Sequence, residues 1–281
     1  MTTIGDVVEV LEAAYPPALA ESWDAVGLVC GDPAEAVSRV LVCVDPVEST
    51  VDEALADGAQ LVVAHHPLLL RGVHGVPAST PKGSLVHRLV RAGAALFCAH
   101  TNADAADPGV SDALAAAIGL SVVGPLNPND DGRTGIGRLG ELSAAEPFSA
   151  FVERVAAALP ATAAGVRGAG DPDRPIRTVA VSGGAGDSYL GVAAALGVDA
   201  YVTADLRHHP ASEHLASGRG PALVDVAHWA SEWPWCEQAA AILRDAFDGN
   251  VTITVSTRCT DPWTVAAVSP PVPGRTGRFP G

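Results

Sequence analysis

The segment that decides the fold reads Leu61-Val-Val-Ala-His-His-Pro67. Its four apolar residues predict the end of a buried strand, because a short apolar run bounded by a turn residue is typical of strands covered on both faces. The proline then removes a backbone donor and stops the strand. Two adjacent histidines therefore follow a buried strand, and by themselves they fit a hydrogen-bonded turn as well as a metal site.

A strand–helix–strand pattern surrounds this segment, and the pattern occurs twice in the chain. In the first copy a strand at 40–44 and a helix at 49–57 precede the strand at 61–64. In the second copy a strand at 178–182, a helix at 188–196 and a strand at 200–203 are followed by His208-His209-Pro210. Strands that alternate with helices are typical of α/β proteins. We therefore expect an α/β fold of two related three-layer lobes.

The remaining pattern divides the chain into three parts. Further strands are expected at 94–99, 222–227 and 251–256, and further helices at 84–92, 111–118, 148–159 and 236–247. The loop signal Asn127-Pro-Asn-Asp-Asp-Gly-Arg133 marks the join between the lobes. We expect an N-terminal lobe at 1–125, a C-terminal lobe at 126–257, and a proline-rich tail at 258–281 that lies on the surface or is disordered.

Composition excludes several classes of function. Acidic residues outnumber basic residues 32 to 17, which gives a net charge of −15 and argues against nucleic-acid binding. No apolar run approaches the ~18 residues that a membrane span requires, and the N-terminus lacks the basic start of a signal peptide. The five cysteines form no C-x-x-C pair. We therefore expect a cytoplasmic protein with reduced cysteines, no nucleic-acid partner and no membrane contact.

Polar clusters follow three of the expected strands. They are His65-His66, His100 with Asp104, and His228 with Glu232. Functional groups of open α/β sheets collect at the carboxyl ends of strands. Imidazole and carboxylate are ligands of zinc, iron and manganese, and a carboxylate can bridge two ions. The clusters therefore predict a site for two divalent transition metal ions.

The local setting of the third cluster gives a more detailed expectation. Pro234 stands two residues after Glu232, where it is suited to begin a helix. We therefore expect His228 and Glu232 on the turn between a strand and that helix. His208 and His209 stand in a polar run and are expected in a loop or at a pocket rim.

Two glycine- or tryptophan-containing segments leave alternatives open. The segment Ser182-Gly-Gly-Ala-Gly186 fits a plain tight turn as well as a cradle for an anion, and Gly184 and Gly186 are the candidate substrate-binding residues. It matches neither nucleotide-binding fingerprint. The segment Glu21-Ser-Trp-Asp24 fits a packed turn anchored by Trp23.

With these residues in place, the sequence resembles the GTP cyclohydrolase I type 2 family, also called the Nif-three-like family. The resemblance extends from the N-terminal helix to about Phe247. The segments that carry it are Glu21-Ser-Trp-Asp-Ala-Val-Gly-Leu-Val-Cys-Gly31, Ala64-His-His-Pro67, His100-Thr-Asn-Ala-Asp-Ala-Ala106, Gly109-Val-Ser-Asp112, Gly135-Ile-Gly-Arg-Leu-Gly140, Ser182-Gly-Gly-Ala-Gly186, Asp199-Ala-Tyr-Val-Thr-Ala-Asp205 and Ala227-His-Trp-Ala-Ser-Glu232.

The resemblance implies a fold, a metal site and an activity. It implies a two-lobed α/β fold with a dinuclear metal site between the lobes, a toroidal homohexamer, and hydrolytic opening of the GTP imidazole ring. By motif position the implied ligands are His65, His66, Asp104, His228 and Glu232. Glu232 would be the bridge between the ions.

The resemblance leaves one role and the substrate open. His100 is the candidate catalytic residue, either as a further ligand or as a neighbour of the ligands. The family commonly has Thr-Gly-Glu where this chain has Thr203-Ala-Asp205, a change that could alter the pocket. The substrate is expected to be a small molecule, with a nucleotide among the candidates. A hydrolase of another phosphoester or amide and a metal-binding protein without turnover remain as alternatives.

Overall fold

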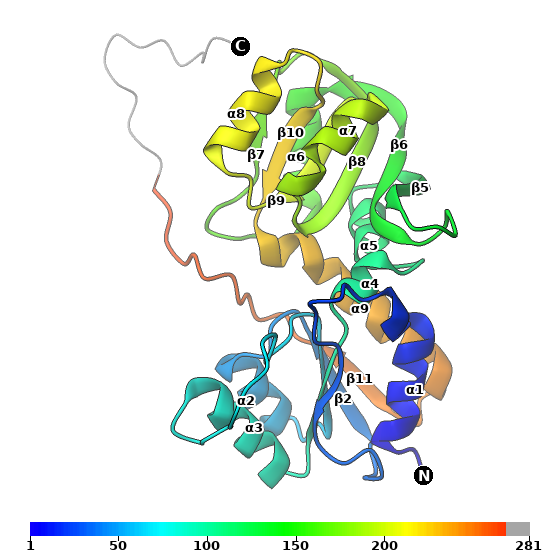
Figure 1. Ribbon diagram of the computed structural model, residues 1–281, viewed down its shortest axis with the longest axis vertical. Coiled ribbons are helices and arrows are strands. Elements are labelled where there is room, and N and C mark those ends of the chain that lie inside the picture. The colour runs from blue at the N-terminus through cyan, green and yellow to red at the C-terminus, as the bar shows by residue number, and fades with distance from the viewer. Residues whose placement is uncertain (268–281) are drawn as a thin grey trace.

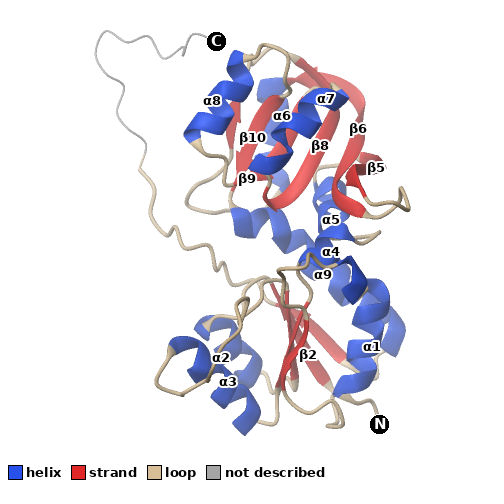
Figure 2. Cartoon of the chain, viewed as in Figure 1, coloured by secondary structure: helices blue, strands red, loops and turns tan. Residues whose placement is uncertain are grey.

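The computed structural model describes residues 1–267, and they form two sheets with helices on both faces of each (Figures 1 and 2). The expected α/β class is therefore confirmed. The part of the expected tail at 268–281 lies outside the described residues. All five cysteines are free, as the sequence predicts. No helix within residues 1–267 is long and apolar enough to cross a membrane.

The first sheet has five strands in the order β1-β4-β3-β2-β11. The strands are β1 Gly27–Cys30, β2 Arg39–Cys43, β3 Leu61–Ala64, β4 Ala95–Cys98 and β11 Thr252–Val255. Strands β4, β3, β2 and β11 run parallel, so the carboxyl ends of β2, β3 and β4 meet at one edge. Helices α2 (Glu48–Ala56) and α3 (Pro81–Arg91) cover one face, while α1 (Ile4–Ala14) and α9 (His228–Phe247) cover the other.

The second sheet has six strands in the order β5-β6-β8-β9-β10-β7. The strands are β5 Ser121–Pro128, β6 Gly135–Pro147, β7 Arg167–Ala169, β8 Pro175–Ala185, β9 Ala200–Ala204 and β10 Ala222–Val226. Its central strands β8, β9 and β10 are parallel. Helices α5 (Val110–Ala117), α6 (Phe148–Ala158) and α9 pack on one face, and α7 (Leu190–Leu196) and α8 (His208–Ala216) lie on the other.

Helix α9 joins the two sheets, because it packs against β2 and β11 of the first and against β8 and β9 of the second. One apolar core runs through both lobes and includes Phe97 of β4, Trp235 of α9 and Val202 of β9, all fully buried. The short helix α4 (Thr101–Ala105) lies beside α9 at the same junction (Figure 1). The parallel strands of both sheets thus end at the junction that α9 and α4 cross.

The strand–helix–strand repeat predicted from the sequence is present in both sheets. Strands β2 and β3 pair in parallel around α2, and β8 and β9 pair in parallel around α7. The division of the chain is less simple than the sequence suggests. The expected boundary at 125 falls within β5, and β11 returns to the first sheet although it follows the second in sequence.

Candidate metal centre

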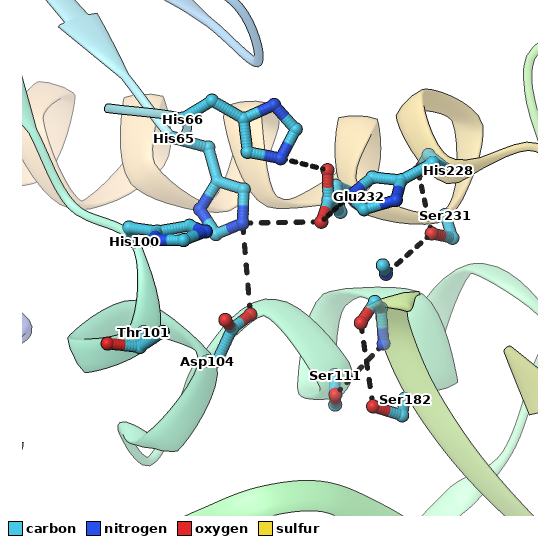
Figure 3. Close-up of polar contacts among 12 residues, drawn as sticks. His65, His66, His100, Thr101, Asp104, Ser111, Ser182, His228, Ser231 and Glu232 are labelled. Carbon is cyan, nitrogen blue, oxygen red and sulfur yellow. Dashed lines mark hydrogen bonds and ion pairs between the residues drawn. The ribbon is translucent and has the colours of Figure 1, made fainter. Parts of the chain in front are cut away.

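Strand β3 delivers two histidines directly to the junction between the sheets. The backbone of the pair continues the parallel ladder, since the His65 N–H donates to Cys43 O at 3.1 Å and the His66 N–H donates to Val44 O at 2.9 Å. The His65 side chain is fully buried and that of His66 is partly buried. Both rings lie beside Glu232 of α9, as Figure 3 shows.

Helix α9 supplies the facing side chains. His228 is its first residue and Glu232 lies one turn later, a spacing of four residues that places both on one helix face. Glu232 is 3% exposed, and its Oε1 lies 3.0 Å from His228 Nε2 while its Oε2 lies 3.0 Å from His66 Nε2. The expectation of a turn here was wrong, because the helix begins at His228 and includes Pro234. Its start follows β10 at once, which brings both side chains to the strand ends.

Helix α4 contributes the third cluster. His100 caps its N-terminus, and Asp104 lies four residues later with its Oδ1 3.8 Å from His65 Nε2. The His100 ring lies 5.2 Å from the His65 ring and 5.7 Å from the His66 ring, between ring centroids. Ligand atoms of His65, His66 and His100 lie within 4.8 Å of one another, as do those of His66, His228 and Glu232. The three predicted clusters are therefore brought together.

Each histidine of this cluster has a partner at its outer nitrogen. His65 Nδ1 lies 2.9 Å from Ala99 O, and the Nδ1 atoms of His66, His100 and His228 lie 2.7, 2.9 and 2.7 Å from carboxylates of Asp45, Asp24 and Asp205. Such outer partners fix ring orientation and tautomer in metal sites. An Nδ1–H that donates outward leaves Nε2 as the ligand atom facing the centre. None of these three aspartates was predicted from the sequence as a site residue, although each follows or precedes a strand.

The surroundings of the buried His65 Nε2 show whether the cluster could hold a cation. Its ring donates through Nδ1 to a carbonyl, which can only accept, so in the neutral ring Nε2 carries a lone pair. That lone pair has no hydrogen-bond partner and faces Glu232 Oε1 at 3.5 Å and Asp104 Oδ1 at 3.8 Å. Ligands at ~2.0–2.2 Å from one zinc ion stand at comparable separations from each other. A cation between these atoms would satisfy all three, so the residues fit a metal ion.

The electrostatics of the cluster distinguish its two carboxylates. Burial raises the pKa of Asp104 to about 6, with the nearby Glu232 charge adding to the rise against the opposing effect of the histidines. Burial would also raise the pKa of Glu232, but His66, His65 and His228 hold it well below its usual range. Glu232 is thus ionised at neutral pH and is the permanent anion of the cluster.

A cavity of about 370 Å³ opens onto the cluster on the side of α4 and β8. His100, Asp104, His228 and Glu232 all line it. Gly184 also lines it, with a backbone φ of +66°, and a Cβ there would stand 2.5 Å from Glu232 Oε1. The absence of a side chain at this position gives Glu232 its space.

The glycine-rich segment that contains Gly184 forms the end of strand β8. Strand β8 continues to Ala185, with an irregularity in its pairing to β9 after Val181. Gly186 faces the interior, where a Cβ would meet Tyr201 and Thr203. Its space is therefore filled by β9 side chains, whereas the space at Gly184 adjoins the cluster.

Other candidate residues lie apart from the cluster. His208 and His209 are exposed and begin α8, so the expectation of a loop is corrected to a helix start, although His208 does line a surface pocket. Trp23 does not act as a packed anchor, because it is 57% exposed. The side chain of its neighbour Asp24 is fully buried and accepts a hydrogen bond from His100 Nδ1.

Together the fold and the site define an α/β protein whose two sheets converge on a histidine–carboxylate cluster with the donor set of a metal site. Residues 2–262 match the family Duf34/NIF3 (NGG1p interacting factor 3), and the chain belongs to this family. The chain is 53% identical to a GTP cyclohydrolase 1 type 2 homolog of Streptomyces coelicolor, with 99% of each chain covered. It is 42% identical to a homolog of the same name from Mycobacterium tuberculosis, with 92% of this chain and 96% of that one covered.

Solved structures show the same fold. The Staphylococcus aureus protein SA1388 superposes with a TM-score of 0.85 at 27% identity, covering 94% of this chain and 99% of that one. A Bacillus cereus protein related to NIF3 superposes with a TM-score of 0.83 at 24% identity, with 94% and 99% of the chains covered. The architecture of two sheets joined at one helix is therefore shared across relatives of low sequence identity.

Proposed function

We propose that this protein is a dinuclear metal-dependent hydrolase. The observation that carries the proposal is the buried Nε2 of His65, which has no hydrogen-bond partner and faces two carboxylate oxygens at 3.5 and 3.8 Å. His65, His66, Asp104, His228 and Glu232 would hold two divalent transition metal ions, with Glu232 between them. Zinc, iron and manganese all accept these ligands.

Two bound ions would supply the chemistry of a metal-assisted hydrolysis, in which a substrate group is polarised and the pKa of water is lowered toward neutrality. The chain itself supplies orientation and proton transfer. His100 lines the cavity and lies beside both His65 and His66, so its Nε2 is placed to move a proton to or from a substrate. Asp24 accepts from His100 Nδ1 at 2.9 Å and holds the ring in that orientation.

The names of the relatives suggest a reaction. A GTP cyclohydrolase opens the imidazole ring of GTP by hydrolysis, which releases formate. We propose this reaction for the present chain on the basis of family membership and the fit of the site to metal ions. The test is to incubate the metal-loaded protein with GTP and to measure formate. Release that scales with metal occupancy and is lost in His100→Ala supports the proposal.

The failure of that test would separate the alternatives. If a fully metallated sample releases no formate, the cyclohydrolase reaction is excluded, and a panel of phosphoesters and amides then tests for another hydrolase. If no substrate in the panel is turned over, a metal-binding protein without turnover is the better description. The residues of the centre, unlike the reaction, are common to all three possibilities.

We also propose that the protein assembles as a toroidal homohexamer, on the strength of the family resemblance alone. Native mass spectrometry of the metal-loaded protein tests this assembly. A mass of six chains supports it, and a stable monomer or dimer at micromolar concentration excludes it.

A further inference from the structure

The turn from Glu21 to Asp24 borders the mouth of the cavity that opens onto the metal centre. Glu21 and Trp23 line the cavity together with His100, Asp104 and Glu232. Both Glu21 and Trp23 are exposed, while the side chain of Asp24 between the turn and the centre is fully buried. The turn therefore presents two side chains to the cavity and anchors itself through a third.

The turn is fixed in place at both ends. The Glu21 N–H donates to Thr101 Oγ1 at 2.9 Å, and the Asp24 N–H donates to Glu21 O at 2.9 Å. Asp24 in turn accepts from the backbone N–H of Thr101 at 3.0 Å and from His100. Because these bonds tie the turn to the start of α4, Glu21 and Trp23 have a defined position relative to the centre.

Trp23 is a large apolar surface held at this position in contact with solvent. It is 57% exposed, and its ring stands nearly perpendicular to the His100 ring at a centroid separation of 6.1 Å. An exposed aromatic ring on a fixed support is suited to stack on a planar ligand. The His100 contact places such a ligand within reach of the candidate proton-transfer residue.

Glu21 favours a ligand that also carries hydrogen-bond donors. An ionised carboxylate has two oxygens that accept hydrogen bonds, so it pairs best with two adjacent N–H donors. In a planar heterocycle such a pair is an amidine-type edge, with a ring N–H next to an exocyclic amino group. The charged side chains that line this cavity within residues 1–267 are carboxylates and histidines, which also favours a donor-rich ligand.

We propose that Glu21 and Trp23 are specificity-determining residues that bind a planar heterocycle with an amidine-type edge. Trp23 stacks on the ring, and the Glu21 carboxylate accepts from the ring N–H and the adjacent amino group. The inference rests on the proposed function, because it assigns a substrate class to the same cavity. It concerns the binding of the heterocycle and requires no turnover.

The experiment measures equilibrium binding of guanosine and inosine by isothermal titration calorimetry. The two nucleosides differ by the exocyclic amino group, so only guanosine offers the paired donors. We expect the wild-type protein to bind guanosine roughly tenfold more tightly than inosine, in line with hydrogen bonds to a charged group. Glu21→Gln should remove this preference, because an amide offers one acceptor and one donor in place of two acceptors.

Variants of tryptophan test the stacking. Trp23→Ala should weaken the binding of both nucleosides by roughly tenfold, whereas Trp23→Phe should retain most of it. Val73→Ala is the control, since Val73 is an apolar side chain that is 51% exposed and lies outside this cavity and outside the second cavity that His66 and His228 line. The oligomer mass and metal content of each variant are measured on the same samples.

Three results would overturn the inference. They are an absence of measurable guanosine binding by the wild-type protein, unchanged nucleoside affinities in Glu21→Gln and Trp23→Ala, and an altered oligomer mass in Trp23→Ala without altered affinity. Failure of the proposed function has a different signature. A metallated protein that releases no formate, yet loses guanosine binding in these variants, would exclude the cyclohydrolase reaction and support the heterocycle site.

Discussion

The two strand–helix–strand units of the protein both lead to the sequence His-His-Pro, yet only the first His-His pair belongs to the candidate metal centre. His65 and His66 follow β3 directly, and their backbone N–H groups still bond to the neighbouring strand. Three residues separate His208 and His209 from the end of β9, and the two histidines are exposed and begin α8. The position of a histidine relative to the strand end, rather than the motif, decides whether it faces the centre.

The residue that follows β9 directly contacts the outer side of a cluster histidine. Asp205 stands there in a left-handed backbone conformation, with a φ of +57°, and its Oδ2 lies 2.7 Å from His228 Nδ1. The first unit thus contributes His65 and His66 to the cluster directly, and the second contributes Asp205, which contacts a histidine of the cluster from outside. One unit therefore places residues in the cluster, and the other places a residue that orients His228.

The largest expected effect separates the two histidine pairs. Glu232→Ala removes the carboxylate that contacts His66 and His228 at 3.0 Å each, so metal binding should fall by more than the ~10–100-fold that outer partners contribute. The double variant His208→Ala/His209→Ala should retain the metal content of the wild-type protein. Elemental analysis after dialysis against a chelator measures both. Loss of metal in the double variant would show that His208 and His209 also bind metal, which contradicts the distinction between the two histidine pairs.

Two glycines with left-handed backbone conformations separate an effect on the site from an effect on stability. Gly184 and Gly197 have φ of +66° and +69°, so an alanine costs each ~1–2 kcal/mol of backbone strain. Only at Gly184 does the new Cβ collide with Glu232, since nothing lies within 4 Å of Gly197. Gly184→Ala should therefore lose metal affinity beyond its loss in thermal stability, whereas Gly197→Ala should lose stability alone. Equal metal affinities in the two variants would mean that Gly184 does not shape the site.

Outer carboxylates should have an intermediate effect. Asp45→Asn weakens the acceptor that lies 2.7 Å from His66 Nδ1, and such changes typically cost ~10–100-fold in metal affinity. Asp57→Asn is a suitable control, because Asp57 is a surface residue paired with Arg39. Competition with a fluorescent zinc chelator gives both affinities. An unchanged affinity in Asp45→Asn would show that the outer partner is dispensable.

The smallest expected effect is a pH dependence of metal-linked stability. Burial lowers the pKa of His66, but the charges of Glu232 and Asp45 outweigh burial and raise this pKa to about 11. Burial also lowers the pKa of His228, and there Glu232 and Asp205 outweigh it and raise the pKa to about 9. Both exceed the ordinary value of 6.5, so these protons stabilise the metal-free protein most below pH 6.5, and this stability declines toward pH 9 and above.

Metal ions compete with the same protons, so metal affinity should rise over that range. The difference in melting temperature between metal-loaded and metal-free protein should therefore widen from pH 6.5 to pH 9. Differential scanning fluorimetry checks this, with Glu232→Ala as the control that lacks the main anion. A melting-temperature difference that narrows as the pH rises would contradict the inference that metal ions displace protons from His66 and His228.

Much of the parallel framework could be predicted from the sequence, because buried parallel strands are continuous apolar runs. Leu61–Ala64 and Ala95–Cys98 are examples in which every residue is buried. The hairpin of β5 and β6 could not be predicted, since β5 is mostly exposed and carries little apolar pattern. The return of β11 to the first sheet depends on a pairing with β2 some 200 residues away, which no local signal contains.

The candidate site shows a similar limit. The histidine and carboxylate clusters were predictable, since each follows an expected strand closely. The outer aspartates were not, because Asp24 contacts His100 from 76 residues away and Asp45 contacts His66 from 21. The helical setting of His228 was missed because Pro234 suggested a later helix start. Long-range contacts, rather than residue types, carried the missing information.

The most direct test of the account is an anomalous difference map from crystals of the zinc-loaded protein, measured above and below the zinc absorption edge. We expect two peaks at the junction of the sheets, between the Nε2 atoms of His65, His66 and His228 and the carboxylates of Asp104 and Glu232. An absence of peaks there in a crystal that holds zinc elsewhere, or peaks at His208 and His209 instead, would contradict it.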